Sequence, residues 1–481
     1  MESLEKYKAV LFLRKLFSSK YLPVVSAVVL LACYYLGLDV IGFWYFGLCG
    51  FCIMLTCRDV SPVFSVFLMM GLIISAQHTP SILWGEPSDY YTRPVNLVPI
   101  GLAVALMAGM AIVRTVDSIK RGAFKLNPVF MGLCAFVVAM MLNGAFSENQ
   151  TVMGAVYAAF LALLFLGIFT FACGNIQVNE STFERIAFSF VVLLAVLTIE
   201  LAVAYITYGN IFVNGAIDRG SIRFGWGTYN NFGMYVTLCI PAPFYLAAKY
   251  RRGWAFTLLS VLNVAVAFLS MSRQAILMGG ILYAVCAVWL LIRTKGRVRL
   301  YHALVLFSFA FVALVALAVT YKQFAHMFSS LAASLSTGSS RTVIWKEGIN
   351  LFLNYPLFGG GLYSRRQWVW GQSGFADIIP VMYHNTVVEL LASGGVVSFG
   401  AYAVHRLQTV LSFFKNVTHD RFYVALTIGG LLLVSLLDNH IFYLFPTIIY
   451  SLLLGVLVLS EKKEEVKGAK AKAENDITVA A

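Results

Sequence analysis

Charged side chains are scarce in this chain. They make up 12% of its 481 residues, whereas hydrophobic residues make up 60%, and the mean hydropathy is +0.81. An average soluble domain is about a quarter charged, so the composition excludes a soluble globular protein. Apolar runs long enough to cross the ~30 Å hydrocarbon core of a bilayer recur along the whole length. A transmembrane β-barrel would instead show alternating segments of about ten residues.

These runs predict an all-α fold, a polytopic transmembrane helical bundle of about 14 spans. The spans would fill residues 21–321 and 383–460, separated by a long, partly helical extracytoplasmic loop at 322–382. Residues 1–20 are basic and amphipathic without a small-residue cleavage site, so we expect a cytoplasmic surface arm and no cleavable signal peptide. The Lys/Glu/Ala-rich residues 461–481 would form a flexible cytoplasmic tail.

Cysteine is absent from the long polar loops. All eight cysteines lie in or at the ends of apolar runs, which argues against a disulfide framework. Cys49, Cys52 and Cys57 have a spacing loosely like that of metal ligands, but no histidine lies near them. We therefore expect buried thiols and no metal site.

The net charge of +13 raises the question of a nucleic-acid partner. With the N-terminus inside, however, 26 of the 35 Lys and Arg residues fall in cytoplasmic segments, such as 114–125, 293–299 and 406–421. This asymmetry follows the positive-inside rule, so the basic excess reflects topology. The predicted partner is the lipid bilayer and not nucleic acid, with both termini in the cytoplasm.

Some arginines remain on the outer side, where positive residues are disfavoured. Arg219 and Arg223 lie in a Gly-rich loop before a span, where they could bind an anionic ligand or extend to lipid headgroups. Arg273 lies between two closely spaced spans, and leaving it in hydrocarbon would cost several kcal/mol, so it should face a wet cavity or an anion. Arg341 precedes a helical pattern in the long loop. Guanidinium groups gathered at a membrane surface suit a phosphate ligand.

His384 stands at the outer start of a span and is followed by Asn385 and, one turn later, Glu389. An imidazole can accept a proton at neutral pH or donate to a phosphate, but a histidine here could also simply cap the helix. Asp438 lies at another outer helix junction, where it could supply a carboxylate or form a tight turn. Glu200 lies inside a span and should face other helices.

Taken in order, these residues resemble the motifs of the O-antigen ligase and polymerase superfamily, over about residues 215–400. Its members carry an arginine in a loop before an Asn-rich helix start, a Ser-Arg pair between spans, an Arg-x3-Trp helix leading to Pro-Leu-x-Gly-x-Gly, and a His-Asn-x3-Glu-Leu helix opening with a following glycine. The matching residues here are Arg223 with Asn230 and Asn231, Ser272 with Arg273, Arg341 to Trp345 with Pro356 to Gly361, and His384 with Asn385, Glu389, Gly394 and Gly395.

The resemblance implies a glycosyltransferase of the GT-C type that uses polyprenyl-diphosphate-linked glycans at the outer leaflet, without a cofactor. No Asp-x-Asp pair lies in the outer segments, so arginines would replace a divalent cation, and direct displacement would invert the anomeric carbon. The implied roles are diphosphate binding for Arg223, Arg273 and Arg341, and catalysis for Arg273 and His384. His384 would deprotonate or orient the acceptor hydroxyl, or else bind the second lipid's phosphate. Asn231, Asn385 and Glu389 would support the site, and from their own positions in the sequence we expect the same of Arg219 and Asp438.

The number of expected spans exceeds that usual for the ligases, which favours a polymerase of repeat units for a cell-surface polysaccharide. The alternatives are a ligase that transfers the glycan to lipid A core or another acceptor, and a lipid-linked oligosaccharide flippase or anion transporter. Transporters tend to place charged groups near the midplane, whereas these cations gather at one interface. The implied location is the bacterial cytoplasmic membrane. The implied partners are the lipid-linked donor, a glycan or lipid-linked acceptor, and chain-length regulator or flippase proteins.

Overall fold

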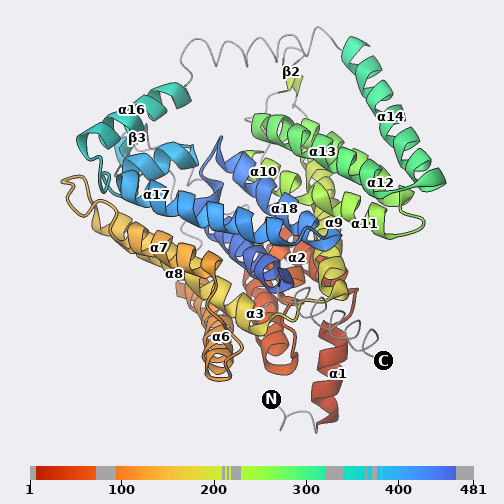
Figure 1. Cartoon of the computed structure of the whole chain (residues 1–481), viewed down its shortest axis with the longest axis horizontal. Helices are drawn as coiled ribbons and strands as arrows, with labels where there is room; N and C mark the ends of the chain where they lie inside the picture. The colour runs from red at the N-terminus through yellow and green to blue at the C-terminus, as the bar shows by residue number, and fades with distance from the viewer. Residues whose placement is uncertain are drawn as a thin grey trace, which may run out of the picture.

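The computed structural model describes residues 7–71, 94–207, 212–213, 216–217, 229–319, 340–364, 366–370, 376–380 and 382–461. Its elements are almost all helices, which form a polytopic bundle as predicted (Figure 1). The first half contains α1 (Lys8–Phe17), α2 (Leu22–Tyr35), α3 (Asp39–Thr56), α4 (Val63–Met69), α6 (Pro94–Lys120), α7 (Pro128–Met141), α8 (Val152–Asn175) and α9 (Glu180–Thr207). The second half contains α10 (Tyr229–Cys239), α11 (Pro241–Lys249), α12 (Trp254–Leu269), α13 (Arg273–Arg293), α14 (Gly296–Val319), α16 (Ser340–Asn354), α17 (Thr386–Lys415), α18 (His419–Ser435), the 3-10 turn η4 (His440–Phe442) and a C-terminal helix, Leu444–Glu461.

The described helices within residues 21–319 and 386–461 coincide with apolar runs of the sequence. Some of these helices are short: α7 has 14 residues and α12 has 16. Seven helices in the described part of the chain are long and apolar enough to cross a membrane, or eight if α1 and α2, which meet at 81°, form one bent span. The seven are α3, α6, α8, α9, α13, α17 and Leu444–Glu461.

Helix interruptions have local causes. The apolar stretch at 231–249 is divided into α10 and α11, because Pro241 cannot donate the helical backbone hydrogen bond. Helix α17 is the longest element, but its backbone leaves helical geometry at Gly395. The break divides α17 into an outer part, which carries the motif residues, and a longer part that continues to Lys415.

The core is continuous and apolar, with α9 among its most buried helices. Glu200 on α9 is only 3% exposed, so it faces the protein interior as expected. Helix α17 packs along α7 and α16, and α3 packs along α6. This packing places α16 and the loop after it directly against the outer part of α17.

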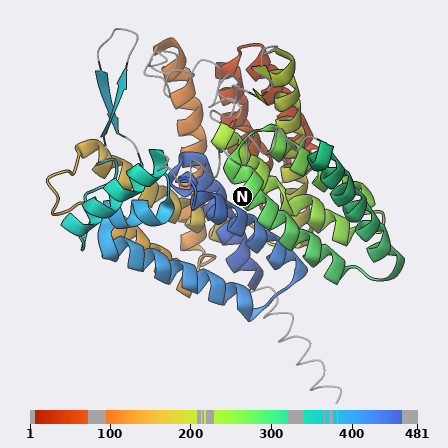
Figure 2. The ribbon, with the colours of Figure 1, turned by 90° about the horizontal axis from the view of Figure 1, so that it is seen from above.

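The long loop predicted at 322–382 contains the helix α16 and, in addition, a β-hairpin that we did not predict. Strand β3 (Arg366–Trp370) pairs antiparallel with β4 (Ala376–Pro380), with Trp368 opposite Ile378. This hairpin projects from the helices (Figure 2). A second, shorter hairpin pairs β1 (Phe212–Val213) with β2 (Ala216–Ile217).

Candidate active site at the start of helix α17

The break in α17 is filled by the loop that follows α16. Gly395 has φ 61° and ψ −162°, so the helical hydrogen bonds around it cannot form. Backbone polar groups left unpaired in an apolar interior cost free energy, and irregular backbone at such a position must find partners within the protein. Four main-chain hydrogen bonds provide them: Gly360 N to Ala392 O (2.7 Å), Gly361 N to Ser393 O (2.9 Å), Val396 N to Pro356 O (2.9 Å) and Val397 N to Leu357 O (3.2 Å).

This contact requires glycine on both sides. A Cβ on Gly359 would lie 2.3 Å from the carbonyl carbon of Ser393, and a Cβ on Gly395 would lie 2.4 Å from that of Leu357. Both glycines also have positive φ, which side chains disfavour. The Pro-Leu-x-Gly-x-Gly motif and the glycine pair after Glu389 are therefore two halves of one backbone contact, which fixes α16 relative to the outer part of α17.

Just before α17, His384 forms a pair with Asp438. The two side chains meet at 2.9 Å between Nδ1 and Oδ1; the His384 side chain is 37% exposed, whereas that of Asp438 is 6% exposed. His384 has φ 51°, a left-handed conformation that a residue with a side chain adopts at a cost. It does not cap the helix, so that alternative is wrong: Asn385 is the cap, and its side chain accepts from Val387 N and Val388 N.

Asp438 lies in the connection between α18 and η4. Burial by itself would raise the pKa of its carboxyl group, but the hydrogen bond from His384, the charges of His440 and His384, and the backbone N–H of Asn439 together lower the pKa below its usual value. The hydroxyl of Tyr443 lies 3.5 Å from the same oxygen. A buried carboxylate that accepts an imidazole N–H fixes the ring orientation and leaves the other ring nitrogen for chemistry.

Arg341 lies at the edge of this pair. Its guanidinium donates to the carbonyl of Leu437 at 2.7 Å, one residue before Asp438. His440, two residues after Asp438, is fully buried, and burial lowers its pKa to about 4; the Asp438 charge opposes this shift, and the charges of Arg341 and His384 add to it. The amide nitrogen of Gln274 donates to Nε2 of His440 at 2.6 Å.

Four helices begin at this cluster: α10, α13, α16 and α17. The first-turn N–H groups of a helix lack intrahelical partners and carry partial positive charge, so converging N-termini favour an anion. Polar groups at or beside each N-terminus make the linking contacts. These are Gln274 of α13 to Asn230 O of α10 (2.6 Å), Asn230 Nδ2 to Asp438 Oδ2 (3.5 Å), Arg341 of α16 to Leu437 O, and Asn385 of α17 to Leu436 O (2.8 Å).

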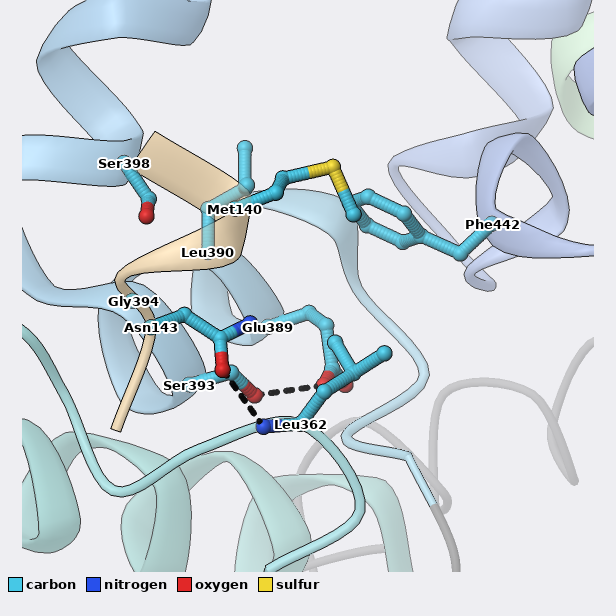
Figure 3. Close-up of a pocket in the computed structure, with 9 residues that line it drawn as sticks. All are labelled: Met140, Asn143, Leu362, Glu389, Leu390, Ser393, Gly394, Ser398 and Phe442. Carbon is cyan, nitrogen blue, oxygen red and sulfur yellow. Dashed lines mark hydrogen bonds between the residues drawn. The ribbon is translucent and has the colours of Figure 1, made fainter. Parts of the chain in front are cut away.

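Glu389 lies one turn inside α17, behind the pair, and is 1% exposed. It borders a small pocket at the break in α17, whose volume of about 10 Å³ is close to the space that one water molecule needs (Figure 3). In this pocket Ser393 Oγ donates to Glu389 Oε1 at 2.7 Å, and Leu362 N donates to Asn143 Oδ1 at 3.2 Å. The remaining lining residues are Met140, Leu390, Gly394, Ser398 and Phe442.

The structure brings five of the predicted residues together: Arg341, His384, Asn385, Glu389 and Asp438. Arg273 is the first residue of α13, half-buried and next to Gln274, and Asn231 is the third residue of α10, next to Asn230. Arg219 and Arg223 lie outside the described residues, so their roles stay predictions.

Three further residues belong to the cluster, although we assigned them no role from the sequence: Gln274, Asn439 and His440. Gln274 follows Arg273 directly, and Asn439 and His440 follow Asp438. Their positions in the sequence could have indicated them. Each is a polar residue close to a predicted site residue, in a short junction between two apolar segments. Within the described residues, no group of three or more His, Cys, Asp or Glu side chains is placed to hold a metal ion.

Fold and cluster together define a polytopic membrane protein with a histidine–carboxylate pair and arginine where several helices begin. The sequence model of the O-antigen ligase family matches residues 258–403, from α12 into α17. This stretch is therefore similar to the O-antigen ligase family, which supports a relation to the O-antigen ligase and polymerase superfamily. The matched stretch includes Arg273, Arg341, His384 and Glu389, whereas Asp438 lies beyond it. No curated protein matches the chain.

Proposed function

We propose that this protein is a glycosyltransferase that polymerises polyprenyl-diphosphate-linked oligosaccharide repeat units at the outer face of the bacterial cytoplasmic membrane. The observation that carries the proposal is the His384–Asp438 pair, which lies beside Arg341 where four helix N-termini meet. A base and an anion-binding region side by side suit a reaction in which a hydroxyl displaces a diphosphate. The similarity to the O-antigen ligase family supports this general class of activity.

His384 is the base in this proposal. Asp438 occupies Nδ1, so Nε2 is the nitrogen that takes the proton of the acceptor hydroxyl. The carboxylate stabilises the imidazolium that forms and keeps the ring in place. The partial exposure of His384 allows an acceptor sugar to reach it, while Asp438 stays buried behind it.

The donor diphosphate lies at the helix N-termini. Arg341, together with Arg273 and Arg223, neutralises the charge that grows on the leaving group as the bond from the anomeric carbon to the diphosphate oxygen breaks. The acceptor oxygen forms the new bond to that carbon from the opposite side, which inverts its configuration. In this scheme the arginines and helix N-termini supply the positive charge, and no divalent metal takes part.

The membrane side of the reaction follows from the charge distribution. The 26 Lys and Arg residues assigned to the cytoplasmic side support an orientation with both termini inside and the start of α17 outside. Labelling of single introduced cysteines with a membrane-impermeant maleimide tests this orientation. A cysteine at Asn416 should be protected in intact cells and one at Lys346, which is exposed on α16, should be labelled.

Reconstitution tests the activity. The purified protein in liposomes, supplied with a defined lipid-linked repeat unit, should produce a ladder of longer glycans, and His384→Ala should abolish it. Transfer only when lipid A core is added would identify a ligase. Translocation of the lipid-linked unit without a new glycosidic bond would identify a flippase and overturn the proposal. Chain-length regulator and flippase proteins are the expected partners in the cell.

A further inference from the structure

The buried carboxylate of Glu389 bonds both segments that carry the proposed catalytic pair. Its Oε2 accepts from the backbone N–H of Tyr383 at 2.7 Å and from Nδ2 of Asn439 at 2.8 Å. Tyr383 directly precedes His384, and Asn439 directly follows Asp438. One oxygen atom therefore joins the two segments immediately beside the His384–Asp438 hydrogen bond.

Three donors hold the side chain of Glu389. Its second oxygen accepts from Ser393 Oγ at 2.7 Å, so both oxygens of the side chain are held by donors of the protein. At 1% exposure the side chain lies behind the pair and does not present itself to a substrate.

The bond to Tyr383 also bears on the conformation of His384. A left-handed residue with a side chain persists only where its surroundings fix it, and Tyr383 N is fixed from within helix α17. Asn385 and Thr386 hold the other side, through bonds to Leu436 O and to Ser435 O at 2.7 Å. Among Glu389, Asn385 and Thr386, only Glu389 bonds both the residue before His384 and the residue after Asp438.

We propose that Glu389 is a positioning residue, which holds His384 and Asp438 at hydrogen-bonding distance by clamping Tyr383 and Asn439 together. This inference rests on the proposed function. Glu389 takes no proton from the acceptor and does not contact the donor. It acts through the distance and orientation between the base and its carboxylate partner.

The clamp predicts different effects for two substitutions of Glu389, to glutamine and to leucine. In Glu389→Gln, the amide oxygen can accept from Tyr383 and Asn439 while the amide nitrogen donates to Ser393 Oγ, so every bond survives and only the charge is lost. Glu389→Leu removes all three bonds at similar size. Ser393→Ala is the matched control, because it removes only the bond that does not reach either segment.

Kinetics of glycan transfer provide the first test. Glu389→Leu and Asn439→Ala should each lower kcat by about 100-fold, the effect of a small misplacement of catalytic groups, with the KM for the lipid-linked donor unchanged. The double variant should be no slower than the worse single one, because both remove the same link. Glu389→Gln and Ser393→Ala should retain most of the wild-type kcat. Wild-type kcat in Asn439→Ala, or a Glu389→Gln variant as slow as Glu389→Leu, would overturn the clamp.

A second readout is independent of turnover. Diethyl pyrocarbonate labelling of His384, followed by peptide mass spectrometry, should be faster in Asn439→Ala and Glu389→Leu than in the wild type, because the imidazole leaves Asp438. The fully buried His405 and His440 report whether the protein is still folded. Unchanged labelling of His384 in both variants would refute the clamp whatever the activity. A wild-type protein without transferase activity would instead refute the proposed function.

Discussion

Arg341 Nη1 donates to the main-chain oxygen of Leu437 at 2.7 Å, so the guanidinium of α16 is anchored one residue from the carboxylate that holds His384. The anchor is a carbonyl group, which leaves the positive charge of Arg341 without neutralisation by this contact. Such a guanidinium can be held in place and still act on an anion. The bond therefore fixes where the charge stands and leaves that charge for the donor diphosphate.

Substitution of Arg341 tests that role. Arg341→Ala should lower transfer activity by about 10²-fold, as for loss of one preorganised donor to a developing charge. Arg341→Lys keeps the charge without the planar fork and should recover part of the activity. The control is Lys346→Ala, an exposed residue on the same helix, which should behave as the wild type. Equal activity of Arg341→Ala and Lys346→Ala in the liposome assay would remove Arg341 from the mechanism.

The carboxylate of Asp438 provides a second test. Asp438→Asn keeps the size and an oxygen acceptor for Asn439 N–H but no longer favours the ring tautomer with hydrogen on Nδ1, and we expect kcat to fall by about 10²- to 10⁴-fold. Asp117→Asn is the control, since that carboxylate forms an exposed ion pair with Arg121 and should be dispensable. The measurement is the initial rate at saturating donor. A rate for Asp438→Asn within threefold of the control would contradict the pairing.

The free energy of unfolding should fall in acid, because the pKa values of Asp438 and His440 are both lowered in the folded protein. The pKa of Asp438 is lowered in the folded protein, so its contribution is present at neutral pH and is lost as the pH falls below the usual carboxyl range. The pKa of His440 is lowered from 6.5 to about 4, so the unfolded chain binds more protons between these values and stability declines across them. Thermal unfolding in detergent should show this decline, and His440→Gln should flatten it. An identical slope in that variant would exclude His440 as a source.

The glycines at the helix break give a prediction on folding. Gly395→Ala should destabilise the protein by about 2 kcal/mol or more, because a Cβ meets the backbone of Leu357 and the residue has positive φ. Gly400→Ala on the same helix has open space around the new Cβ and should stabilise by about 0.5–1 kcal/mol. Melting curves of the two variants test the contrast. Similar melting temperatures would show that the break does not constrain the chain.

The sequence predicted the fold through local signals. Long apolar runs located the helices, since hydropathy and length are properties of neighbouring residues. The ends were less predictable. The helix that begins after His384 continues to Lys415 and includes Arg406, which we had counted in the cytoplasmic segment 406–421. The guanidinium of Arg406 lies 4.3 Å from the ring centroid of Tyr402 and 4.5 Å from that of Tyr450. Aromatic rings can stabilise an arginine inside a helix bundle through cation–π contacts, and a count of charges along the sequence does not detect such contacts.

The site was also predictable only as far as local sequence signals reach. His384, Arg341 and Asp438 were conspicuous because polar residues at the ends of apolar spans need a reason. Their pairing was not predictable, since Asp438 lies 54 residues from His384 and spacing along the chain carries no distance between them. The link from Glu389 to Asn439 spans 50 residues and had no local signal either. The β3–β4 hairpin was also missed, although its segment alternates aromatic and other residues.

The contact between residues 356–361 and the break in α17 is made by main-chain atoms, and this limits how such a protein can diverge or be engineered. Side chains there can be exchanged wherever glycine is not required, because none of the four bonds depends on them. The number of residues cannot change: one insertion or deletion in either stretch would displace all four bonds together. A chimaera with a relative should therefore exchange 356–361 and 392–397 as one unit.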